Sequence, residues 1–132
     1  MTDIFEGVDV ISMYTRKQAI EDGFQVQLTE VHAKLAIEAG YLYPVFLTTG
    51  VFSLIEKACS KPKHFNDFTG VLWDILWMSR AYSKPLNDFT SSFEVIITGT
   101  GRKRIHKMLI KCGATDFDNP APAFTIMLPD ED

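Results

Sequence analysis

The sequence lacks the features that mark secreted, membrane-spanning or metal-dependent proteins. Its two cysteines, Cys59 and Cys112, are too few for a disulfide scaffold and too far apart for a metal-binding knuckle. No stretch approaches the roughly 18 consecutive apolar residues that cross a bilayer. The N-terminus is acidic and has no apolar stretch typical of a secretion signal. We therefore expect a cytoplasmic protein with reduced cysteines and no membrane span.

Catalytic and cofactor motifs are also missing. The three histidines have no metal-ligand spacing with each other or with a cysteine. The Gly99–Gly101 segment precedes an expected strand rather than a helix, so it is not a nucleotide-binding fingerprint. No serine lies in a nucleophile-elbow pattern. We expect no metal and no cofactor, and the sequence favours a non-enzymatic protein over an enzyme.

The length and composition of the chain are typical of one globular domain. A chain of 132 residues with 46% hydrophobic residues and ten phenylalanines is large enough to form a core without metals or disulfides. We therefore predict a single domain over residues 1–132.

Helix signals dominate the first half of the chain. Threonine caps predict four short helices, which begin after Thr15, Thr29, Thr48 or Thr49, and Thr69. The fourth, over residues 70–82, is apolar almost all round and is expected to lie centrally. Between the helices, apolar and polar residues alternate over residues 24–28, which predicts a short strand. Pro44 confines residues 41–47 to an edge strand or an extended segment.

The second half has the pattern of strands. Residues 93–97, 105–112 and 124–128 are rich in β-branched and apolar side chains, and residues 113–122 are expected to form a loop. We predict an α+β fold in which a helical N-terminal half, with about four short helices, packs against a C-terminal three-stranded antiparallel meander.

Trp73, Trp77 and Arg80 recur at helical spacing and form one stripe. Tryptophan and arginine dominate binding hot spots, so the stripe is a candidate pocket or interface. The alternative is that both indoles fill the core and the stem of Arg80 covers them. Asp74 in the same helix is expected to pair with Arg80, Arg16 or a backbone amide rather than to act as an acid or base.

Tyr14 and Arg16 open the first helix. A cation at this end opposes the helix dipole, which favours anions there. Arg16 therefore faces either an anionic ligand or partner, or a surface carboxylate with which it pairs.

Positive charge is concentrated in one strip. The strip consists of Arg102, Lys103, Arg104, Lys107 and Lys111, with His106 among them and no acidic residue, whereas the net charge of the chain is −4. It is a candidate contact for phosphates or for an acidic protein surface. The alternative is a solvated sheet face that discourages aggregation. Nucleic acid is possible but not favoured, because the rest of the chain is acidic and no aromatic residue is interleaved in the strip.

Three stretches carry a family resemblance. Residues 14–23, 72–78 and 124–132, together with residues 39–45 and 111–113, resemble a family of small uncharacterised proteins, a domain of unknown function, encoded on bacterial plasmids and phages. The resemblance implies a bacterial host cell but no activity, and no catalytic residue can be carried over. Family members commonly have a Gly-Pro-Gly-type loop after the cysteine, where this chain has residues 113–116, so a function placed on that loop is doubtful here.

These observations favour a non-enzymatic binding or accessory protein of a phage or plasmid that acts on a host or defence-related protein. A second hypothesis is a binder of a small anionic ligand, such as a nucleotide, or of nucleic acid through Arg16, Arg80 and the basic hairpin 102–111. A third is a small enzyme with a site that joins Asp74 or His106 to other polar groups. The oligomeric state is left open.

Overall fold

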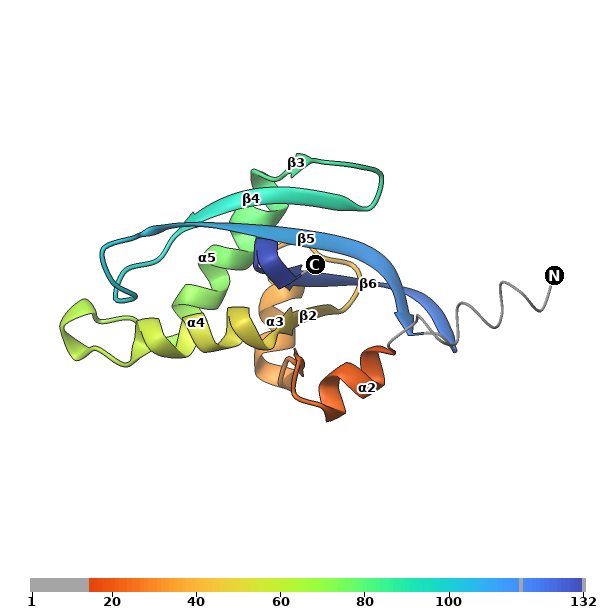
Figure 1. Ribbon diagram of the computed structural model, residues 1–132, viewed down its shortest axis with the longest axis horizontal. Coiled ribbons are helices and arrows are strands. Elements are labelled where there is room, and N and C mark those ends of the chain that lie inside the picture. The colour runs from red at the N-terminus through yellow and green to blue at the C-terminus, as the bar shows by residue number, and fades with distance from the viewer. Residues whose placement is uncertain (1–14, 117, 132) are drawn as a thin grey trace.

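The computed structural model describes residues 15–116 and 118–131 and contains one sheet with helices on it (Figure 1). In the described part of the chain, the α-helices are α2 (Arg16–Glu21), α3 (Glu30–Glu38), α4 (Thr49–Cys59) and α5 (Phe68–Ala81). Two short 3₁₀ turns are η1 (Pro62–His64) and η2 (Pro129–Glu131).

The sheet is mixed. Its strands are β1 (Gln25–Gln27), β2 (Val45–Thr48), β3 (Lys84–Pro85), β4 (Thr90–Ile96), β5 (Ile105–Asp116) and β6 (Asn119–Met127). They lie side by side in the order β1-β2-β6-β5-β4-β3. Only the β2–β6 pair among them is parallel, and it brings Leu47 opposite Ile126.

Helices α3, α4 and α5 pack on one face of this sheet. Leu47, Ile126, Met108 and Val95 point from the strands into the same core as Leu72 of α5. All five side chains are fully buried or nearly so. The amphipathic pattern of α4 and the apolar composition of α5 therefore produce one continuous core beneath four strands.

The opposite face carries a smaller layer. Phe46 and Thr125 point to this side, because they alternate with core residues along β2 and β6. The short helix α2 lies over them, and its N-terminal end is held by the sheet and by its own cap. Thr15 and Gln18 form the predicted capping box, and the carboxylate of Asp116 accepts hydrogen bonds from the N–H groups of Arg16 and Lys17.

The predicted three-stranded antiparallel meander is wrong. Its strands are present as β4, β5 and β6, but β1, β2 and β3 extend the same sheet to six strands of mixed direction. The helices are not concentrated in an N-terminal half either, since β1 and β2 alternate with them and α5 lies beyond the midpoint of the chain. The loop expected over residues 113–122 is instead the distal end of the long β5–β6 hairpin.

Two local predictions failed for identifiable reasons. Pro44 precedes β2 instead of interrupting it, so all four residues of β2 are buried between neighbouring strands, and its carbonyl accepts a bond from Phe124 N–H. Asp67, not Thr69, caps α5, because its carboxylate accepts a 2.7 Å hydrogen bond from Gly70 N–H.

Candidate functional site

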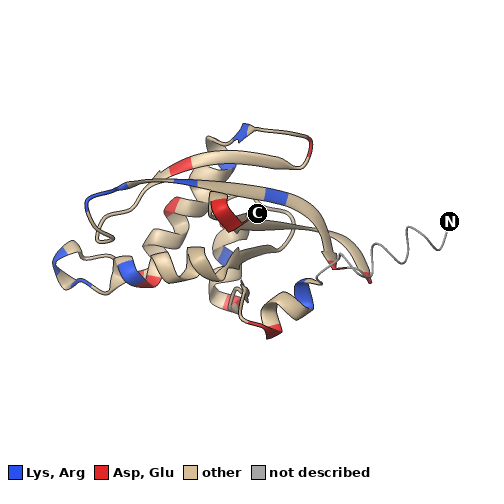
Figure 2. Cartoon of the chain, viewed as in Figure 1, with Lys and Arg blue, Asp and Glu red and all other residues tan. Residues whose placement is uncertain are grey.

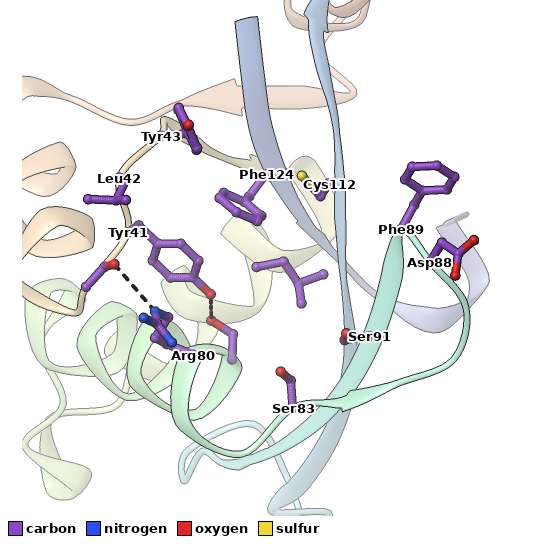
Figure 3. Close-up of a pocket in the computed structure, with 13 residues that line it drawn as sticks. Tyr41, Leu42, Tyr43, Arg80, Ser83, Asp88, Phe89, Ser91, Cys112 and Phe124 are labelled. Carbon is purple, nitrogen blue, oxygen red and sulfur yellow. Dashed lines mark hydrogen bonds between the residues drawn. The ribbon is translucent and has the colours of Figure 1, made fainter.

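A cleft of about 370 Å³ opens where the C-terminal end of α5 meets the strands (Figure 3). The α3–β2 loop forms one wall, and the turn between β3 and β4 forms the other. We call this hollow the Tyr41 cleft; it is lined by Gly40, Tyr41, Leu42, Tyr43, Ser79, Arg80, Ser83, Asp88, Phe89, Ser91, Ile110, Cys112 and Phe124.

Buried hydroxyl groups lie at the base of the Tyr41 cleft. Ser79 donates its proton to the carbonyl of Leu76 at 2.7 Å, so the Tyr41 hydroxyl donates to Ser79 across 2.5 Å. Burial raises the pKa of Tyr41, while the bond to Ser79 and the charge of Arg80 act in the opposite direction. Tyr41 therefore stays neutral, and its hydroxyl oxygen lies near the charge of Arg80.

Arg80 is exposed at the mouth of this cleft. Its Nε donates a long 3.4 Å hydrogen bond to the carbonyl of Gly40, a residue at φ 110° where a Cβ would lie 3.2 Å from the same nitrogen. The glycine thus allows the guanidinium to lie against the backbone of the loop. Figure 3 shows Ser83 and Ser91 on the far side of the hollow from this guanidinium.

A second concave surface follows the outer edge of β4. Strand β3 pairs only with Ser91 and Ser92, so the rest of this edge has no partner strand among the described residues. The N–H of Ile97 donates to Arg104 across the β4–β5 turn, and β4 pairs with β5 in regular register. Because the backbone N–H and C=O groups alternate in direction along a strand, those of Glu94 and Ile96 point away from β5, toward the free edge of the sheet.

Two adjoining hollows lie along this edge, of about 370 and 420 Å³, and they share Met78 and Glu94. We call them together the edge groove. Its floor is the outer side of α5, and its lining is Asp74, Trp77, Met78, Tyr82, Lys84, Ser92, Phe93, Glu94, Val95, Ile96, Ile105 and Lys107. Four large apolar or aromatic side chains are exposed there: Trp77 at 45%, Tyr82 at 64%, Ile96 at 66% and Ile105 at 54%.

Asp74 has no hydrogen-bond or ion-pair partner among the described residues, so the expected pairing with Arg80, Arg16 or a backbone amide is absent. Partial burial beside Trp77 and Met78 raises its pKa. Glu94 lines both hollows and lies opposite Lys107 in the register of β4 and β5, and Lys84 borders the hollow near β3.

The structure separates the residues of the predicted tryptophan stripe. Trp73 packs against the core cluster and stacks on Trp77, with ring centroids 6.0 Å apart. Trp77 lines the edge groove, and Arg80 lines the Tyr41 cleft. Neither tryptophan is fully buried, so α5 contributes to two surfaces instead of one.

Arg16 is held on the opposite face of the sheet, and Tyr14 lies outside the described residues. The guanidinium donates to Thr115 O at 2.6 Å and to Thr125 Oγ1 at 2.8 Å, and it lies 4.2 Å from the centre of the Phe46 ring. Burial lowers the pKa of Arg16, and the charge of Asp116 opposes that shift. These contacts describe an arginine that joins α2 to the sheet.

The basic strip is divided between a turn and a strand (Figure 2). Arg102, Lys103 and Arg104 are exposed in the β4–β5 turn. His106 Nε2 lies 3.1 Å from Thr100 Oγ1, and the pKa of His106 is lowered by burial and by the charge of Lys103, with a hydrogen bond that the ring donates to the backbone of Lys103 acting against this. The strip therefore does not form one site, because Arg102, Lys103 and Arg104 lie in the turn, whereas Lys111 of β5 lies opposite Thr125, which Arg16 contacts.

No helix among the described residues is long and apolar enough to cross a membrane. No group of three His, Cys, Asp or Glu side chains in residues 15–116 and 118–131 is placed to hold a metal ion.

Comparison with known proteins places the chain in a family. A family of unknown function, DUF6573, matches residues 1–132. The chain belongs to the DUF6573 family. No curated protein and no solved structure was similar enough to match. Membership of DUF6573 therefore covers the whole chain but assigns no activity to it.

Several lining residues of this DUF6573 protein were not predicted. The sequence contained one signal for Ile96 and Ile105. Each is an isoleucine at an exposed strand position, where a polar side chain is usual. No sequence pattern identified Asp88 and Phe89 as lining residues, since their place in the Tyr41 cleft depends on the fold of the β3–β4 turn.

Proposed function

We propose that this protein is a non-enzymatic binding protein that acts by holding another protein in the edge groove. The single observation that carries the proposal is the edge of β4 that no strand of the described residues covers, beside exposed Trp77, Ile96 and Ile105. Large apolar side chains around a hollow are typical of protein-binding surfaces, and aromatic residues dominate their affinity.

The side chain of Asp74 supports the same conclusion. Asp74 is exposed and has no partner among the described residues, and the burial of part of its surface raises its pKa and slightly disfavours the folded state, so its position is not explained by stability. Proteins often retain such residues where binding needs them. The resemblance to proteins of plasmids and phages makes a host or defence-related protein, in the bacterial cytoplasm, the partner that we propose.

A binding role fits the Tyr41 cleft better than catalysis does. Cys112 is its reactive group, but none of the three histidines lines the cleft to act as its base. His106, the other candidate from the sequence, is bonded to Thr100 in the β4–β5 turn.

The experiment is a pull-down from bacterial lysate with the full chain and two matched variants. Ile96→Lys places a charge in the edge groove, whereas Ile37→Lys makes the same change at an exposed position on α3. We expect one dominant protein to be retained by the native chain and by Ile37→Lys, and to be lost with Ile96→Lys. Equal retention by both variants would refute the edge groove as the binding surface.

The second candidate function is binding of a small anionic ligand in the Tyr41 cleft. It is favoured by one observation, the exposed guanidinium of Arg80 opposite the serine hydroxyls. Calorimetric titration with inorganic phosphate and with a nucleoside monophosphate tests it. We expect Arg80→Gln to abolish any binding, and binding that survives this change would exclude the cleft.

A further inference from the structure

Two loops meet at the left end of the molecule in Figure 1: residues 60–66 between α4 and α5, and residues 98–104 between β4 and β5. We call them together the basic end. We propose that the basic end binds the surface of an anionic phospholipid membrane, with the ring of Phe65 at the lipid interface and the surrounding cations on the phosphates. This surface is separate from the edge groove and from the Tyr41 cleft, since neither is lined by a residue of the two loops.

Hydrogen bonds join the two loops into one surface. Asn66 Nδ2 donates to Thr98 O at 2.9 Å, across 32 positions of the chain, and to Ala58 O at 3.1 Å. Gly99 packs against the same Ala58 carbonyl, because a Cβ at this glycine would lie only 2.9 Å from that oxygen. The cations of the β4–β5 turn are therefore held beside those of the α4–α5 loop, which the sequence does not reveal.

The basic end carries charge of one sign. Its exposed lysines and arginines are Lys61, Lys63, Arg102, Lys103 and Arg104. None of these forms an ion pair with a described residue, and neither loop contains an acidic residue. Asp67, which directly follows the first loop, directs its carboxylate to Gly70 N–H at 2.7 Å. Figure 2 shows the blue segments of both loops at the same end of the molecule, and an anionic surface placed there would relieve their mutual repulsion.

Phe65 lies among these cations, and the fold does not explain its ring. The side chain is 93% exposed, and the backbone has a φ of 54°, a left-handed conformation that favours glycine or asparagine. The N–H of Phe65 closes the η1 turn by donating to Pro62 O at 3.0 Å, but the turn does not use the ring. An exposed aromatic ring at a position that would suit asparagine better indicates a contact outside the molecule.

A membrane surface fits this combination better than a nucleic acid or a protein does. The interface of a bilayer accepts aromatic side chains at the level of the headgroups, and anionic lipids attract each nearby lysine or arginine. Single-stranded nucleic acid stacks successive bases on several aromatic rings, whereas Phe65 is the single phenylalanine, tyrosine or tryptophan of the basic end. The aromatic anchor of a protein interface is surrounded by contacts that exclude water, whereas Phe65 follows Lys63 and His64, which are both exposed.

The first test is sedimentation of the full chain with lipid vesicles. Vesicles of phosphatidylcholine alone are compared with vesicles that also contain the anionic lipid phosphatidylglycerol. We expect the protein to sediment only with the anionic vesicles, and to be released from them as the salt concentration rises. Failure to bind the anionic vesicles at low salt, or equal binding to both kinds of vesicle, would overturn the proposal.

The second test removes two cations from the basic end. We expect the double variant Lys61→Ala, Lys63→Ala to bind anionic vesicles about 30-fold more weakly, because each cation near such a surface contributes independently to the attraction. The control is the double variant Lys17→Ala, Lys34→Ala, which loses the same charge at exposed positions on α2 and α3 and should bind as the native chain does. Equal losses in the two double variants would show that net charge, not the basic end, controls binding.

The third test removes the ring and keeps the turn. Phe65→Asn places a residue that tolerates a positive φ at this position, so thermal unfolding should show no loss of stability. We expect the variant to bind anionic vesicles about tenfold more weakly, since the ring no longer leaves water. Phe24→Asn, at another exposed phenylalanine, is the control and should keep the native affinity. Native affinity in Phe65→Asn, or a lower unfolding temperature, would contradict the role given to the ring.

The last test distinguishes a membrane from a nucleic acid. Protein bound to anionic vesicles is challenged with a short oligothymidylate at the same concentration of phosphate groups as the exposed lipid. We expect the protein to stay on the vesicles, because only the lipid surface can take up the ring of Phe65. Release of the protein by the oligothymidylate would identify the basic end as a nucleic-acid surface and overturn the proposal.

Discussion

Arg16 illustrates how a side chain that opposes a local rule can be explained by distant partners. It lies at the start of α2, where the helix dipole disfavours a cation. Its guanidinium is nevertheless bonded to Thr115 and Thr125, which are about a hundred positions further along the chain. Asp116 supplies the negative charge that the helix end prefers.

Replacing Arg16 by lysine should destabilise the protein although the charge is kept. Lysine has no planar group to lie flat on Phe46 and no second nitrogen to reach Thr115 and Thr125 at once, so we expect a loss of about 1–3 kcal/mol in the free energy of unfolding. Urea denaturation measures it. The control is Arg104→Lys in the exposed β4–β5 turn, which should change nothing; equal effects of the two would contradict the role given to Arg16.

Asp74 leads to a prediction about pH. Burial raises the pKa of Asp74 in the folded protein. The folded state therefore holds the proton more tightly than the unfolded chain, and stability falls as pH rises from the unfolded pKa of about 3.9 through the folded pKa.

Asp74→Asn removes this titration and should stabilise the protein at pH 7 but not at pH 3. Because Asp74 is exposed, solvent screens much of the effect, and we expect no more than about 0.5 kcal/mol. Unfolding measured at both pH values tests it. A gain of the same size at pH 3 would show that another property of the asparagine is responsible.

At the scale of single elements, α4 depends on the C-terminal end of the described chain. Glu131 accepts hydrogen bonds from Thr48 Oγ1 at 2.7 Å and from Leu128 N–H at 2.8 Å. Its second oxygen lies 3.3 Å from Gly50 N, in the first turn of α4. The carboxylate thus caps this helix from more than 80 residues away and ties η2 to the helix N-terminus.

Removing this cap should weaken the fold. We expect Glu131→Ala to lower the free energy of unfolding by about 1 kcal/mol. Asp130→Ala removes a neighbouring exposed carboxylate and serves as the control. Chemical denaturation distinguishes the two, and a loss that is the same for both would mean that general acidity of the tail, not the cap, is responsible.

Element positions were largely predictable where the signal was local. The Thr15–Gln18 capping box and the Thr29 and Thr48 caps were predicted and are present. The cap of α5 was missed because Asp67 and Thr69 are both good caps, and the choice depended on Phe68 joining the helix, where its ring packs on Phe52. Local patterns find a helix more reliably than they find its first residue.

At the scale of the whole molecule, charge is distributed unevenly. The exposed cations of the β4–β5 turn lie at one end, while the chain as a whole carries a net charge of −4. A protein that coats nucleic acid is usually basic overall, so we do not expect nucleic acid to be the main partner.

Duplex DNA should therefore bind weakly and only through Arg102, Lys103 and Arg104. Three cations on phosphates predict that affinity falls about 40-fold between 50 and 200 mM salt. Electrophoretic mobility shifts of the native chain and of the triple alanine variant measure this. Retention at 200 mM salt, or by the triple variant, would revive a nucleic-acid function.

The sequence by itself determined the helix caps, the apolar character of α5, the three C-terminal strands and the lack of catalytic motifs, because each depends on residues close together in the chain. Only the tertiary structure decided that β1, β2 and β3 join those strands in one sheet. The parallel pairing of β2 with β6 joins segments about 80 residues apart, and no local pattern encodes such a partner. The edge groove follows from the same cause, since a strand edge is free only with respect to neighbours that the fold has already placed.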